Sequence, residues 1–77
     1  MRVSAERLQE IFVDEVNRHK MGEYDTTIRY GHLRGESAMY YPEENEIVID
    51  AGNNDFSERG VRSLIRHEFK HIRQINK

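Results

Sequence analysis

The 77-residue chain has no cysteine and no tryptophan, a single proline, and no long run of apolar residues. The lack of cysteine excludes disulfides, iron–sulfur clusters, cysteine-type zinc fingers and cysteine nucleophiles, so any metal must be held by histidine and carboxylate. No stretch approaches the roughly 18 consecutive apolar residues of a membrane-spanning helix, and no charged-then-apolar leader precedes the first helical pattern. We therefore expect one small cytoplasmic domain over residues 1–77.

Charge is distributed unevenly along the chain, although the net charge is only -2. Residues 1–57 carry six Lys or Arg against twelve Asp or Glu, whereas residues 58–77 carry six against two. A basic block of this kind indicates contact with a polyanion, or attraction between two parts of an assembly, but it does not specify a fold.

Two amphipathic helices are predicted, one near each end of the chain. Ser4 is a candidate N-cap for a helix over residues 5–20, and Gly22 is a candidate for the residue that ends it. A second helix of about 18 to 20 residues is expected to start at Asp55 or Ser57 and to run to the chain end. Its apolar arc consists of Val61, Leu64, Ile65, Phe69, Ile72 and Ile75.

Three β-strands are predicted between the helices. Residues 26–33 and 37–41 are rich in β-branched and aromatic side chains, Pro42 ends the second segment, and 46–51 contains the apolar run Ile-Val-Ile. Short turns between them indicate an antiparallel meander. The fold class expected is therefore α+β: an α-β-β-β-α chain with a three-stranded, mainly antiparallel sheet and two helices on one face.

The second helix contains the sequence His-Glu-Phe-Lys-His, an HExxH pattern. The spacing of four residues places His67 and His71 one turn apart on one side of a helix, where both imidazoles can bind the same zinc ion. Glu68 falls within the apolar arc, so its carboxylate is expected to face the sheet and to need a partner there. The alternative is a surface helix with two solvated histidines and a glutamate paired to lysine or arginine.

This pattern predicts zinc-assisted hydrolysis. Zinc lowers the pKa of a bound water to about 7, Glu68 acts as general base, and the hydroxide attacks a polarised carbonyl. A tyrosine could stabilise the oxyanion, although such strand residues are more often half-buried packing groups. The four candidates are Tyr24, Tyr30, Tyr40 and Tyr41.

Residues 46–74 resemble the core of zincin metallopeptidases: a strand, a short loop with a helix cap, and a helix carrying HEFKH. The chain is most similar to small intracellular forms, the SprT-like and phage-type minimal zincins. The resemblance implies that His67 and His71 are zinc ligands, that Glu68 is the catalytic general base, and that the substrate is a polypeptide. It also implies that strand 46–51 is the edge along which an extended peptide adds.

A catalytic zinc site normally has three protein ligands and one open position, but the motif supplies only two. Metzincins carry a glycine three residues after the second histidine and a third histidine three residues later, where this chain has Gln74 and Lys77. Four explanations remain: the chain is a fragment, an upstream residue serves, a second copy supplies the ligand in a homodimer, or full activity has been lost. His32 and His19 are the upstream candidates.

A second hypothesis concerns the outer face of the second helix, where five cations are spaced three or four residues apart. Such a stripe could follow the phosphate backbone of DNA or RNA, or bind a protein partner, in a domain without catalytic activity. A solvated helix face is the simpler interpretation. The five residues are Arg59, Arg62, Arg66, Lys70 and Arg73.

Overall fold

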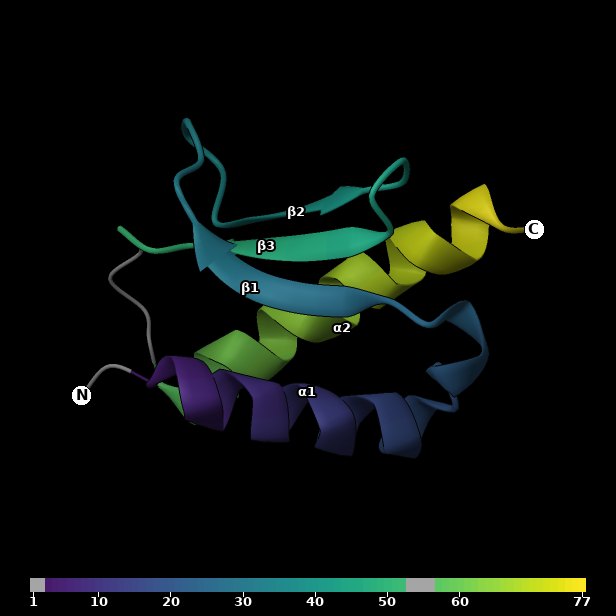
Figure 1. Cartoon of the computed structure of the whole chain (residues 1–77), viewed down its shortest axis with the longest axis horizontal. Helices are drawn as coiled ribbons and strands as arrows, with labels where there is room; N and C mark the ends of the chain where they lie inside the picture. Colours follow the sequence, from purple (N-terminus) through teal and green to yellow (C-terminus); the bar gives the residue numbers. More distant parts are fainter. Residues whose placement is uncertain (1–2, 53–56) are drawn as a thin grey trace.

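The computed structural model describes residues 3–52 and 57–77, and two helices and a three-stranded sheet make up most of this part of the chain (Figure 1). The expected α+β class is confirmed. The helices α1 and α2 flank three strands, and a short 3-10 turn, η1, follows α1. Their bounds are α1 Ala5–His19, η1 Gly22–Tyr24, β1 Thr27–Gly31, β2 Ala38–Tyr41, β3 Glu46–Asp50 and α2 Glu58–Ile75.

The sheet is mixed, with strand order β1-β3-β2, so the predicted mainly antiparallel meander is wrong. β3 pairs in parallel with β1 and antiparallel with β2. The physical reason lies in β3, whose residues 47–49 are all buried and therefore favour the centre of the sheet, with neighbours on both sides. The connection from β1 to β2 passes the end of β3. There the Asp50 amide donates a hydrogen bond to the Ser37 carbonyl, and the Ala51 amide donates one to the Gly31 carbonyl.

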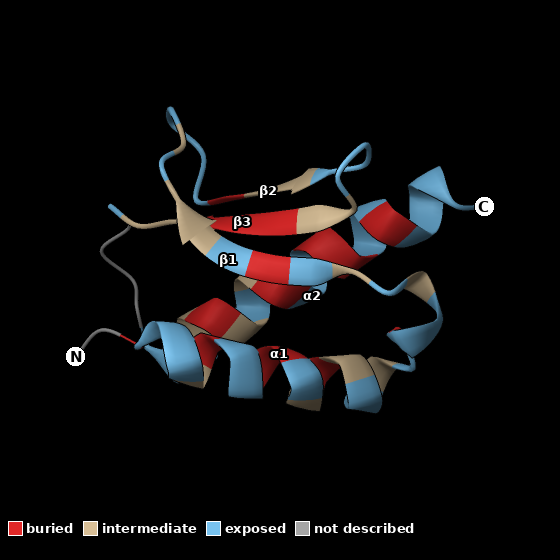
Figure 2. Ribbon diagram, viewed as in Figure 1, coloured by how far each residue is buried: buried red, intermediate tan, exposed pale blue. Residues whose placement is uncertain are grey.

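Both helices pack on the same face of the sheet, as predicted, with α1 beneath β1 and α2 beneath β2. Figure 2 shows buried residues in both helices and in all three strands. Ile47 and Ile49 project into it between the two helices, whereas Val48 lies on the opposite face beside Arg29 of β1. Neither described helix has the length and apolar character that crossing a membrane requires.

Serine side chains cap both helices. The Ser4 hydroxyl accepts from the Arg7 amide, and the Ser57 hydroxyl accepts from the Gly60 amide, each at 3.0 Å. Ser57 is thus the observed cap of α2, while the alternative, Asp55, lies outside the described residues. The expectation that Gly22 ends α1 is wrong, because the helix ends earlier, at His19. Lys20 takes the left-handed conformation, and the Met21 amide donates a hydrogen bond to the Val16 carbonyl. Burial of the Met21 side chain accompanies this earlier ending.

Candidate metal site

The HExxH residues lie in the middle of α2, which orients each side chain differently. Glu68 is buried, whereas His67 and His71 are exposed at the margin of the apolar face. The two imidazole rings are close, with centroids 4.9 Å apart, and meet edge to face. One nitrogen of each histidine and one carboxylate oxygen of Glu68 all lie within 4.8 Å of one another. These donors are of the types that zinc binds, so the group could hold a metal ion.

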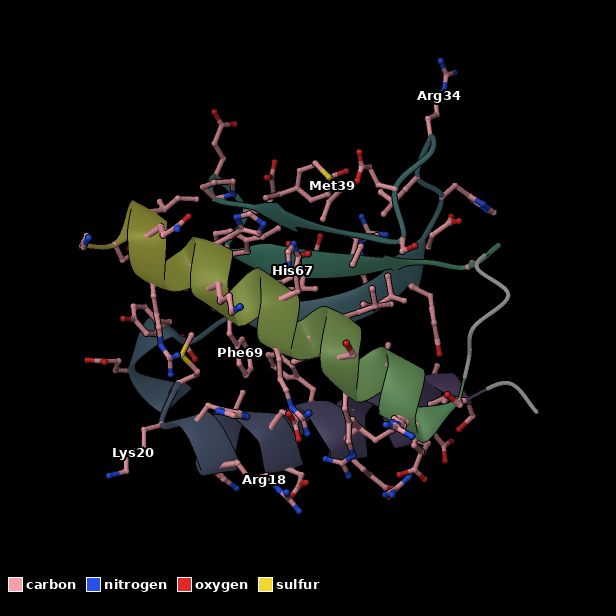
Figure 3. All side chains as sticks on the ribbon, turned by 180° about the vertical axis from the view of Figure 1, so that it is seen from behind. Arg18, Lys20, Arg34, Met39, His67 and Phe69 are labelled. Carbon is pink, nitrogen blue, oxygen red and sulfur yellow. The ribbon has the colours of Figure 1, made fainter. Side chains whose placement is uncertain are left out.

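A cleft of about 520 Å³ opens between α2 and β2, and all three residues line it. In Figure 3, His67 points from α2 toward the sheet, while Phe69 points the other way, toward α1. The cleft wall also includes apolar side chains from both elements, so a carbon-rich group can lie beside the histidines. The lining residues are Gly35, Glu36, Ser37, Ala38, Met39, Tyr40, Leu64, His67, Glu68, His71 and Ile75.

The Glu68 carboxyl group is placed where its charged form is disfavoured. Burial raises its pKa above the ordinary value, and the negative charge of Glu36 raises it further. The two histidines and a hydrogen bond from the Tyr40 backbone amide act in the opposite direction without cancelling the rise. Within the described residues, Glu68 has no Lys or Arg partner, so the alternative of a surface glutamate paired to a cation is not observed.

The edge strand beside the motif is β2, not strand 46–51 as the resemblance implied. β3 lies in the middle of the sheet and is hydrogen-bonded on both sides, so it has no free edge for an added peptide. β2 pairs only with β3 and borders the cleft, which leaves its other backbone edge unpaired by the sheet. The sheet edge beside the motif therefore belongs to β2 and not to β3.

Neither upstream histidine joins the metal-binding group. His19 is in the last turn of α1, where its Nε2 lies 3.4 Å from Glu15 and its ring contacts Phe69. His32 is an exposed residue just after β1 and does not line the cleft. Two of the four candidate tyrosines use their hydroxyl groups elsewhere: the Tyr30 hydroxyl donates to the Val3 carbonyl, and the Tyr40 hydroxyl donates to the Asn45 side chain.

The basic stripe lies only partly on an outer face. Because α1 and α2 are side by side on the same face of the sheet, one flank of α2 faces α1 instead of solvent. Arg62 and Arg66 each bond the buried Glu15 carboxylate at 2.7 Å, and Arg73 donates to the His19 carbonyl. In the part of the chain that the structure describes, Arg59 and Lys70 are the two stripe residues without such contacts. Binding to nucleic acid stays a prediction.

Glu36 was not among the candidate site residues, although it lines the cleft and its charge acts on Glu68. The position of Glu36 depends on which strand forms the sheet edge. With β2 as that edge, the loop before β2 lies beside the face of α2 that carries Glu68. The signal that could have identified Glu36 was the buried run of β3, which favours a central position for that strand and leaves β2 outside it.

No protein-family model, curated protein or solved structure matches this chain. The chemistry of the cleft is therefore inferred from its own residues and from their geometry.

Proposed function

We propose that this chain is a zinc-dependent peptidase domain in which His67 and His71 bind zinc and Glu68 is the general base. The observation that carries the proposal is a buried carboxylate, without a described Lys or Arg partner, placed between two histidines on the wall of a cleft. A buried carboxylate of this kind is costly, which favours a functional reason for its position.

Zinc would supply the Lewis acidity that polarises a carbonyl and lowers the pKa of water. The chain's own contribution is the placement of a base. The Tyr40 amide orients the Glu68 carboxylate, and the raised pKa of Glu68 makes it a better proton acceptor than an exposed glutamate. Glu68 would then take a proton from water in the cleft and return it to the leaving amine.

The edge of β2 that does not pair with β3, apart from its Tyr40 amide, which donates to Glu68, supports a polypeptide as the substrate class. An extended peptide can pair its backbone with this edge, which also holds the scissile bond over α2. Leu64, Ala38 and Ile75 line the cleft below and would contact an apolar side chain of that peptide.

Glu68→Gln tests the mechanism, because it keeps the size of the side chain and removes the base. We expect hydrolysis of an unfolded protein substrate to be lost, while zinc binding measured by native mass spectrometry is retained. Glu43→Gln is the matched control, since Glu43 is an exposed turn residue outside the cleft. Unchanged hydrolysis in Glu68→Gln would refute the mechanism, and wild type without zinc at micromolar metal would refute the metal site.

A further inference from the structure

The described lining of the cleft contains two carboxylates, Glu36 and Glu68, and two histidines. Among these described residues there is no Lys or Arg. In contrast, Glu15 and Glu46 each have an arginine within hydrogen-bond distance. Among the described residues neither Glu36 nor Glu68 has a Lys or Arg within ion-pair distance. Two carboxylates that line one cleft without a counter-charge attract a cation.

The backbone on the two sides of Glu36 is held differently. On one side, the Ser37 carbonyl accepts a 2.9 Å hydrogen bond from the Asp50 amide, so the chain is fixed to β3 just before β2 begins. On the other side, Gly35 has a φ of 81°, and a Cβ placed there would meet nothing within 4 Å. Glu36 itself is exposed. Its carboxylate lies outside the close group of three donors, so binding the same ion would require its side chain to move toward α2.

We propose that Glu36 is the third protein ligand of the metal, completing the site formed by His67 and His71. The inference rests on the proposed function and adds to it the ligand that the motif lacks. Two histidines and one carboxylate are a known ligand set of catalytic zinc, and they leave the fourth position open for water. Glu68 is then free to act as the base. The other upstream candidates, His19 and His32, lie away from the cleft.

Zinc affinity, measured by competition with a chromophoric chelator, tests the assignment without any substrate. Glu36→Gln should weaken zinc binding by on the order of 100-fold. Loss of a direct ligand is expected to cost at least as much affinity as loss of a group that hydrogen-bonds to a ligand. Glu36→His should recover most of this loss, since imidazole is a zinc ligand that carries no negative charge. Glu43→Gln makes the same charge change outside the cleft and should bind like wild type.

Cobalt substitution gives a second measurement. The visible absorption of the cobalt-loaded protein reports its ligand set, so Glu36→Gln should change the spectrum while Glu43→Gln should not. Urea unfolding of the apo variants checks that each one folds, which is expected because Glu36 is exposed.

Different results separate this inference from the proposed function. If His71→Ala abolishes zinc binding while Glu36→Gln stays within about threefold of wild type, the metal site stands and the ligand assignment is wrong. Equal weakening in Glu36→Gln and Glu36→His indicates an effect of charge alone and also overturns it. Zinc bound only by a dimer, with Glu36→Gln unaffected, assigns the third ligand to a second copy. Wild type that binds no zinc overturns both proposals.

Discussion

Replacing Glu15 with glutamine would test what holds the two helices together. Glu15 projects from α1 and is fully buried, and its carboxylate accepts hydrogen bonds from Arg62 and Arg66 of α2, each at 2.7 Å. Glutamine has nearly the same shape, but it is neutral and presents an NH₂ group to one of the two arginines. The substitution therefore removes the charge and at least one hydrogen bond while it leaves the packing unchanged.

The cost follows from the exposure of each partner. A hydrogen bond to a charged group contributes about 1.5–3 kcal/mol. The Arg62 side chain is 20% exposed, whereas Arg66 is 48% exposed and its bond is weakened by solvent. We therefore expect Glu15→Gln to lower the free energy of unfolding by about 2–4 kcal/mol. For a domain of this length the total free energy of unfolding is about 4–12 kcal/mol. The Tm should fall by about 10–30 °C.

This contribution should depend on pH. Burial alone would raise the pKa of Glu15, but its hydrogen bonds and charge interactions with Arg66 and Arg62 together hold the pKa below the ordinary value. A lowered carboxyl pKa stabilises the fold above the unfolded-state pKa of about 4.3, and this stabilisation is lost as pH falls through the folded-state pKa. Asp14 shares Arg62 with Glu15, and His19 Nε2 lies 3.4 Å from the Glu15 carboxylate, so the difference between variant and wild type is the quantity to follow.

Urea unfolding followed by circular dichroism at 222 nm, at pH 7 and at several values below pH 4, measures both effects. The difference between wild type and Glu15→Gln should be largest at pH 7 and should shrink on acidification. Glu10→Gln, an exposed carboxylate on the same helix, is the matched control and should change stability little. A Glu15→Gln variant as stable as wild type at pH 7 would refute the reasoning, as would a difference that does not change with pH.

Two further predictions concern the open face of the sheet and the basic stripe. In Gly31→Ala the new Cβ would lie 2.8 Å from the buried Val48 Cγ1, so urea unfolding should show a loss of about 1–3 kcal/mol, whereas Gly52→Ala, which meets only ordinary contacts, should be nearly neutral. For the stripe, Arg59 and Lys70 alone predict a salt slope of about -1.8 for DNA binding, so affinity should fall about 12-fold between 50 and 200 mM salt. If all five cations bound phosphates, the affinity would fall about 500-fold over the same range. A fall that steep, measured by fluorescence anisotropy, would show that the contacts of the stripe with α1 open.

Local signals in the sequence were enough to predict most of the elements. Ser4 and the apolar spacing that follows it predicted α1, and Ser57 is the observed cap of α2. The β3 run was recognised as a strand, but its place in the sheet was not, because the short turns were taken to join neighbouring strands. A central β3 follows from burial on both faces, which is a property of the assembled layers rather than of the turns.

The site was predictable to the extent that it lies on one helix. The spacing of His67, Glu68 and His71 defines a shared helix face, and the apolar arc correctly placed Glu68 in the interior. Glu36 comes from a loop more than thirty residues earlier, and no periodicity connects it to α2. Arg62 was misplaced for a similar reason, because the pattern of one helix cannot show which neighbour lies along its flank.

The two carboxylates that are buried in the described part of the chain, Glu15 and Glu68, differ in a way that bears on function. Glu15 is surrounded by arginines that lower its pKa, so its burial strengthens the contact between the helices. Glu68 is buried in another part of the molecule, where burial and the charge of Glu36 raise its pKa. Packing alone would favour an apolar residue at Glu68, since an uncompensated buried charge destabilises the apo fold. A cation in the cleft would supply the compensation that the arginines supply to Glu15, so metal binding should stabilise the fold as well as create the site.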